Sequence, residues 1–71
     1  NTMVTTTIKQ IKDAVSEIAD LAKHDTERAH AMEAALLKEV LRVIAQGVPD
    51  AQELAAEAIK ACEIDYERWF A

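Results

Sequence analysis

The sequence predicts an all-α protein, in which a long first helix turns back into a shorter second helix as an antiparallel two-helix hairpin, and two hairpins assemble into a homodimeric helical bundle. Three observations predict this. The 71 residues are 51% apolar but only 4% aromatic, a composition typical of helices. Apolar residues recur three and four positions apart, which lines one face of a helix. The single Gly and the single Pro stand close together, at Gly47 and Pro49, where they predict a turn.

The first helix is expected over residues 7–46. Thr7 and Gln10 fit the Ser/Thr-x-x-Glu/Gln capping box, in which each side chain satisfies the free backbone amide of the other residue. An apolar stripe with coiled-coil spacing follows and is interrupted once, by the polar run at 23–28. The stripe consists of Ile8, Ile11, Val15, Ile18, Ala22, Ala29, Met32, Leu36, Val40 and Val43.

The polar run at 23–28 has two interpretations. It contains neither Gly nor Pro, which favours one continuous helix with a solvated stretch. Alternatively, Asp25 or Thr26 caps a new helix, and the segment before this break folds back to make a three-helix bundle.

The turn is expected at residues 47–49 and the second helix at 50–70. Gly47 suits the left-handed conformation that ends a helix, with Val48 folding back on the end of the first helix. The Pro-Asp pair that follows suits the positive end of a helix dipole. The inner side of the second helix is expected to present Leu54, Ala55, Ala58, Ile59, Cys62, Tyr66, Trp69 and Phe70.

The unequal lengths of the two helices predict a second copy of the chain. At about 1.5 Å per residue, the first helix runs roughly 60 Å and the second only about 30 Å, so half of the apolar stripe would stand in water. The apolar set at 36–44 also spreads around more than one face and needs a cover besides the second helix. A twofold dimer supplies it. The expected dimer interface is Ile8, Ile11, Val15, Ile18, Leu21, Met32 and Leu36.

The formal net charge of −5 and its distribution predict a protein partner rather than a nucleic acid. Lys and Arg are interleaved with acids and form no basic stripe that would neutralise phosphates. A basic protein surface, such as the DNA-binding face of a transcription factor, is a better match. The acidic stripe opposite the apolar one is either a solvated face or a contact for that partner, and the terminal aromatics either close the core or anchor the partner. These candidate partner-binding residues are Asp13, Glu17, Asp20, Trp69 and Phe70.

Chemical motifs are few, and we predict no catalytic residue, cofactor or metal. Glu27 and His30 fit the Glu-x-x-His pattern of di-iron bundles, but such a site needs further carboxylates from other helices. The lone Cys62 is expected to be a small buried hydrophobe and fits a reducing cytoplasm. No apolar run reaches the length of a membrane span, and the N-terminus lacks the pattern of a signal peptide. A cytoplasmic interaction module is therefore expected.

From Met3 onward, the chain resembles small early proteins of Mu-like temperate phages of the quorum-sensing anti-activator type. The resemblance covers the whole chain and rests on its size, helical hairpin pattern, mild acidity and the opening Thr7-Ile8-Lys9-Gln10. It implies a dimeric protein of the host cytoplasm that binds a LuxR-type quorum-sensing regulator, blocks DNA binding by that regulator, and antagonises the type IV pilus assembly ATPase. The residues alone also allow a structural or adaptor hairpin that pairs with another protein, or a metallo-bundle built on Glu27 and His30.

Overall fold

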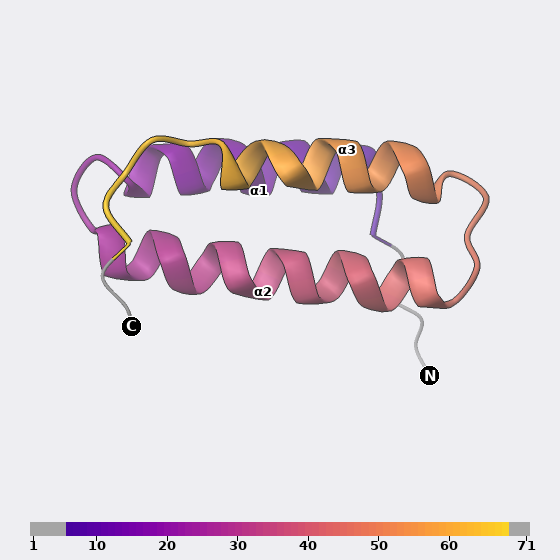
Figure 1. Ribbon diagram of the computed structural model, residues 1–71. Coiled ribbons are helices and arrows are strands. Elements are labelled where there is room, and N and C mark those ends of the chain that lie inside the picture. Colours follow the sequence, from indigo (N-terminus) through magenta and orange to yellow (C-terminus); the bar gives the residue numbers. More distant parts are fainter. Residues whose placement is uncertain (1–5, 69–71) are drawn as a thin grey trace.

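The computed structural model describes residues 6–68, which form three α-helices and no strand. The helices are α1 (Ile8–Leu21), α2 (Thr26–Ala45) and α3 (Ala51–Cys62). Each helix packs against the other two, and α2 runs antiparallel to both α1 and α3 (Figure 1). The all-α prediction is confirmed, whereas the continuous first helix over 7–46 is wrong, because the chain turns between α1 and α2. None of the helices in residues 6–68 combines the length and apolarity needed to cross a bilayer.

A side-chain cap, rather than Gly or Pro, separates α1 from α2. The backbone of Asp25 leaves helical geometry at φ −152° and ψ 78°, and its Oδ1 accepts a hydrogen bond from the Arg28 amide at 3.1 Å. Asp suits this position because its carboxylate satisfies an amide that has no partner inside the helix, at the positive end of the dipole. The Leu21 carbonyl accepts the amides of His24 and Asp25 at 3.0 and 2.7 Å, which closes the turn.

Replacing Asp25 by Ala tests the break between α1 and α2, because a capped break and a continuous helix predict opposite changes in the free energy of unfolding. We expect the free energy of unfolding to fall by about 1 kcal/mol, because the cap bond is lost. In a continuous helix the same change would stabilise the protein, because Ala has a higher helix propensity than Asp. Urea denaturation followed by circular dichroism measures the difference, with Asp25→Ser as the control that keeps a capping oxygen. A more stable Asp25→Ala variant would contradict the capped break.

Two local predictions are confirmed. The Gln10 amide donates to Thr7 Oγ1 at 3.2 Å, and the Thr7 amide donates to Gln10 Oε1 at 2.9 Å, which completes the capping box before α1. Gly47 has φ 82°, the left-handed value that ends α2, and Val48 packs against the core beside it.

The helix predicted over residues 50–70 corresponds to α3, which is shorter and ends at Cys62. The chain then leaves the helix axis and returns toward the start of α2 (Figure 1). The Arg68 guanidinium supports this ending: its Nη2 donates to the carbonyl oxygens of Ala61 and Ile64 at 3.4 and 3.1 Å. A helix leaves its last carbonyls without internal partners, and a cation there satisfies them.

The core is shared by all three helices. One cluster joins Ile11 to α2 and α3, and a second joins Ile18 to Ala29 and Ala61. Ile11 and Ile18 are 0% exposed within a single chain. The prediction that the α1 stripe forms a dimer interface is therefore corrected, because α1 folds back and its stripe is covered by α2 and α3. The other predicted interface residues are partly buried against the same core: Ile8, Val15, Leu21, Met32 and Leu36.

Candidate functional site

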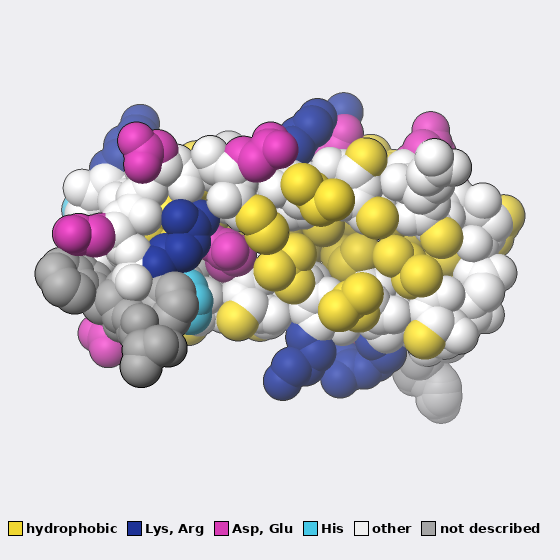
Figure 2. All heavy atoms as spheres, in the orientation of Figure 1, with side chains coloured by type: hydrophobic (Ala, Val, Ile, Leu, Met, Phe, Trp, Pro, Cys, Tyr) yellow, Lys and Arg dark blue, Asp and Glu magenta, His cyan; other side chains and the backbone are white. Residues whose placement is uncertain are grey.

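A shallow apolar groove lies between α2 and α3 on the outside of the bundle. It contains the two exposed large apolar side chains of the described chain, Leu41 at 66% exposure and Ile59 at 52%. Figure 2 looks onto this surface and shows hydrophobic side chains gathered along the line between the two helices. We call it the α2–α3 face. Its volume is about 230 Å³, and its lining is Leu37, Val40, Leu41, Ile44, Ala55, Ala58 and Ile59.

The α2–α3 face exists because α2 carries two apolar stripes. One stripe faces the core through Val40 and Val43, and the other runs through Leu37, Leu41 and Ile44 at spacings of four and three. The spread of apolar residues over 36–44 was the sequence signal for this second stripe. A second cover was expected there, and within the described chain this face stays open.

Two residues expected on the inner side of the last helix lie outside it. Ile59 is half exposed on the α2–α3 face, and Cys62 is an exposed residue rather than a buried one. The reason is that α3 packs against two helices instead of one, so Leu54, Ala58 and Ala61 take the inner positions. Small residues there allow close approach of the helices.

Charged residues border the α2–α3 face unequally. Lys38 and Arg42 follow Leu37 and Leu41 along α2, so they flank the groove on the side away from α3. Figure 2 shows Lys and Arg side chains along this α2 edge. On the α3 side Lys60 follows Ile59 and pairs with Glu57, and the exposed Glu63 lies just after the helix end. The α2 edge of the face is therefore basic, and the α3 side carries both a cation and an acid.

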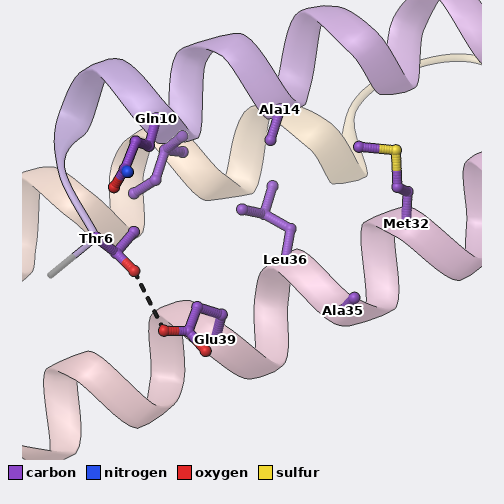
Figure 3. A pocket seen from close by; sticks show the side chains of 8 residues that line it. Thr6, Gln10, Ala14, Met32, Ala35, Leu36 and Glu39 are labelled. Atoms are coloured by element: carbon purple, nitrogen blue, oxygen red, sulfur yellow. Dashed lines mark hydrogen bonds between the residues drawn. The ribbon is translucent and has the colours of Figure 1, made fainter. Parts of the chain in front are cut away.

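A second groove lies between α1 and α2, and we call it the α1–α2 groove. Its volume is about 390 Å³. At one end Gln10 and Thr6 come from the α1 side and Glu39 from α2, and Thr6 Oγ1 donates to Glu39 Oε2 at 3.2 Å (Figure 3). The rest of the lining is apolar and includes two alanines, whose short side chains leave the groove open: Ile11, Ala14, Met32, Ala35 and Leu36.

The predicted acidic stripe is exposed on α1. Asp13 pairs with Lys9 at 3.0 Å, and Asp20 lies 3.8 Å from His24 Nε2, both across one turn of the helix. Glu17 makes no ion pair within residues 6–68. The structure therefore leaves these carboxylates accessible, and their role in binding stays a prediction. The other two candidate residues, Trp69 and Phe70, lie outside the described residues.

Sequence reasoning missed a buried carboxylate that holds the C-terminal segment. Glu33 is 8% exposed, and its Oε1 accepts hydrogen bonds from Tyr66 Oη at 2.6 Å and from Arg68 Nε and Nη2 at 3.2 and 3.0 Å. The Arg68 guanidinium also lies 3.9 Å above the centre of the Tyr66 ring, within cation–π range. The available signal was a charge on the core-facing side of α2, which requires a partner from elsewhere in the chain.

The electrostatics of this cluster follow from burial and pairing. Burial alone would raise the pKa of Glu33, but the bonds from Tyr66 and Arg68 and the charges of Arg68 and His30 bring it below its ordinary value. Burial, and bonding to the Glu33 carboxylate, raise the pKa of Tyr66 to about 12. Partial desolvation of the thiol and the same carboxylate raise the pKa of Cys62, which disfavours a reactive thiolate.

The Glu27 and His30 pattern is not joined by further metal ligands in the described part of the chain. No three His, Cys, Asp or Glu side chains among residues 6–68 come together as a potential metal site. Glu27 is exposed on the first turn of α2, while His30 is half buried and its charge acts on Glu33.

The described chain is a small three-helix bundle with two apolar grooves on its surface and a buried cluster of Glu33, Tyr66 and Arg68. Comparison of the chain with protein-family models, with curated proteins and with solved structures finds no match.

Proposed function

We propose that this chain is a non-enzymatic protein-binding module that acts through its exposed apolar surface. The observation that carries the proposal is the α2–α3 face, where Leu41 is largely exposed and Ile59 half exposed within one contiguous groove. Soluble proteins keep contiguous apolar surfaces of this kind mainly for interactions, because an exposed patch raises the free energy of the free molecule.

A second copy of the chain is the proposed cover of the α2–α3 face. A twofold axis parallel to the helices places α2 of one copy over α3 of the other. In this arrangement the basic edge with Lys38 and Arg42 meets the α3 side, which carries Glu63 besides Lys60, whereas stacking α2 on α2 would bring the basic edges of the two copies together. The proposed homodimer thus uses a different surface from the α1 stripe expected from the sequence.

The proposed partner is a host LuxR-type quorum-sensing transcription factor, and the proposed action is that of a phage inhibitor that blocks its DNA binding. The resemblance in the opening Thr7-Ile8-Lys9-Gln10 supports the partner class, and it also supports antagonism of the type IV pilus assembly ATPase. The exposed carboxylates of Asp13, Glu17 and Asp20 support a partner with a basic surface.

The second candidate function is a structural or adaptor module. It rests on the α2–α3 face as well, but the face is then covered by another protein instead of a second copy.

Replacing Leu41 by Asp tests the proposed dimer. We expect the wild-type chain to sediment as a dimer and Leu41→Asp to sediment as a monomer with unchanged helical content, because the new charge is desolvated only in the dimer. Ala56→Asp is the control, since it adds the same charge to an exposed helical position outside the groove lining. A monomeric wild-type chain would refute the homodimer and favour the adaptor.

The regulator is tested by the mobility of its operator DNA in a gel. We expect the wild-type chain to release a purified LuxR-type regulator from its operator in proportion to the chain added. A regulator that stays bound to DNA at saturating chain would contradict the inhibitory function. A matched gel with an unrelated DNA-binding protein shows whether the effect is selective.

A further inference from the structure

We propose that residues 63–68 form a releasable strap, tied to α2 at Glu33, which opens without unfolding the three helices. The strap leaves the end of α3 as irregular backbone and crosses to α2 (Figure 1). Local opening is typical of segments with few buried apolar contacts and few protected backbone hydrogen bonds. The inference does not depend on which partner covers the α2–α3 face, so it stands or fails apart from the proposed function.

The strap is tied to α2 at a single oxygen atom. Within residues 6–68, its three hydrogen bonds to α2 come from Tyr66 Oη and from Arg68 Nε and Nη2, and all three end on Glu33 Oε1. The remaining Arg68 bonds reach carbonyl oxygens of the strap itself and of the end of α3, at 3.1–3.4 Å. In the same part of the chain, residues 65–68 take part in no backbone–backbone hydrogen bond. Loss of the Glu33 charge therefore weakens every one of these ties to α2 at once.

The apolar contacts of the strap are small. Ile64 and Tyr66 are partly buried against the cluster of Ile18, Ala29 and Ala61, and the residues on either side of Tyr66 are exposed. Two of the three side chains beneath the strap are single methyl groups, which offer little area for burial. Packing alone therefore holds the strap weakly, and the charged bonds to Glu33 keep it closed.

The three helices hold together without the strap. The larger core cluster draws on all three helices and includes no strap residue: Ile11, Val40, Val43, Leu54 and Ala58. The partly buried side chains packed around this cluster also come from outside the strap. Opening of the strap therefore leaves the main core intact, and the helical content should persist.

An open strap lengthens the apolar surface between α2 and α3. Glu33 precedes Leu37 by one turn of α2, and Ala61 follows Ala58 by one turn of α3, so the strap covers the continuation of the α2–α3 face. Figure 2 shows the hydrophobic patch ending on this side at charged side chains of both signs. The tie to Glu33 thus limits how far the exposed apolar face extends.

Acid releases the strap, because Glu33 is the group of this cluster that loses its charge there. The titratable groups that act on the cluster are Tyr66 and Arg68 from the strap, His30 from α2 and Cys62 from the end of α3, while α1 contributes the apolar Ile18. In acid, Tyr66 stays neutral and Arg68 stays charged. The pKa of Glu33 lies below its ordinary value of 4.5, so the strap is closed above about pH 4.5 and opens as the pH falls through the lowered pKa.

Trypsin tests the release, because it cuts after Arg68 only when that side chain leaves Glu33 and enters the protease pocket. We expect Glu33→Gln, which keeps the shape and removes the charge, to speed cleavage after Arg68 by about tenfold or more. Cleavage after Lys38, within α2, reports unfolding of the helices and should keep its wild-type rate. Glu39→Gln is the matched control, since it removes another α2 carboxylate, which pairs with Arg42 instead of the strap.

A second variant grades the effect. Tyr66→Phe removes one of the three bonds to Glu33 and keeps the ring, so it should speed cleavage after Arg68 less than Glu33→Gln does. Equal rates for the wild-type chain and Glu33→Gln would overturn the proposal. An equal rise after Arg68 and after Lys38 would overturn it too, because the strap would then open only with the whole bundle.

Methyl NMR tests the acid release. Between about pH 7 and pH 3, we expect the Ala29 and Ala61 methyl signals, which lie beneath the strap, to shift before those of Val40 and Leu54. Glu33→Gln should show the shifted Ala signals already at neutral pH. If all four wild-type signals moved together, or if the two Ala signals did not move, the strap would not open as a separate unit and the proposal would be refuted.

Discussion

Replacing Ile18 by Asp is expected to unfold the chain. Ile18 is 0% exposed in the cluster that joins it to Ala29 and Ala61. Truncating such a side chain to Ala already costs about 2–5 kcal/mol, and a buried carboxylate without a partner adds to that loss. A single core of this size supplies only about 3–5 kcal/mol, so little or no stability should remain. Circular dichroism should show the loss of helical signal at room temperature.

The matched control is Ile59→Asp, which makes the same chemical change on a half-exposed residue. Ile59 lies on the α2–α3 face, where a carboxylate of the free chain stays in water. We expect this variant to keep its helical signal. If Ile18→Asp melted like the wild-type chain, α1 would not be packed against α2 and α3, and the three-helix core would be refuted.

Replacing Glu33 by Ala is expected to lower the free energy of unfolding by about 2–3 kcal/mol. Tyr66 Oη and two nitrogens of Arg68 would lose their acceptor, and breaking a buried charge pair costs about 3–5 kcal/mol. The lower figure applies because the Arg68 side chain is 23% exposed and regains some hydration. Glu57→Ala is the control: its ion pair with Lys60 is more exposed and should contribute less than about 1 kcal/mol.

The contribution of Glu33 depends on pH with a definite sign. Its pKa in the folded chain lies below the ordinary 4.5, so the stabilisation is fully present above about pH 4.5 and is lost as the pH falls through the lowered pKa. Tyr66 makes stability depend on pH in the alkaline range. Because its pKa is raised to about 12, its stabilisation is fully present below about pH 10 and is lost as the pH rises towards 12. Urea titrations across pH should show reduced acid dependence in Glu33→Ala. If the free energy of unfolding of Glu33→Ala fell at acid pH as steeply as that of the wild-type chain, the pairing of Glu33 would be contradicted.

The features predicted correctly are those that a few neighbouring residues decide. The capping box of Thr7 and Gln10 and the left-handed Gly47 depend on side chains and backbone within one turn. The apolar stripe was also correct as a buried stripe, because helical periodicity alone selects its members. The helices that cover the stripe were not predicted correctly, because periodicity does not say whether the facing helix comes from the same chain or from a second one.

The candidate binding surfaces were predicted only in part. The exposure of Asp13, Glu17 and Asp20 follows from their position opposite the apolar stripe, and the structure places them there. The α1–α2 groove itself depends on the packing of α1 on α2 and was not foreseen. The α2–α3 face was signalled by surplus apolar residues on α2, but the sequence could not show that Ile59 would lie beside them.

The sequence by itself determined the helical class, the capped start of α1, the turn at Gly47 and the need to bury one stripe, because each depends on local chemistry or periodicity. Only the tertiary structure decided whether Asp25 breaks the first helix. A cap worth about 1 kcal/mol is close in energy to a continuous helix, and the burial of Ile11 and Ile18 against α2 and α3 tips the balance. Because α1 folds back, the apolar stripe that predicted a second chain lies in the core of one chain. The exposed apolar surface lies on α2 and α3 instead.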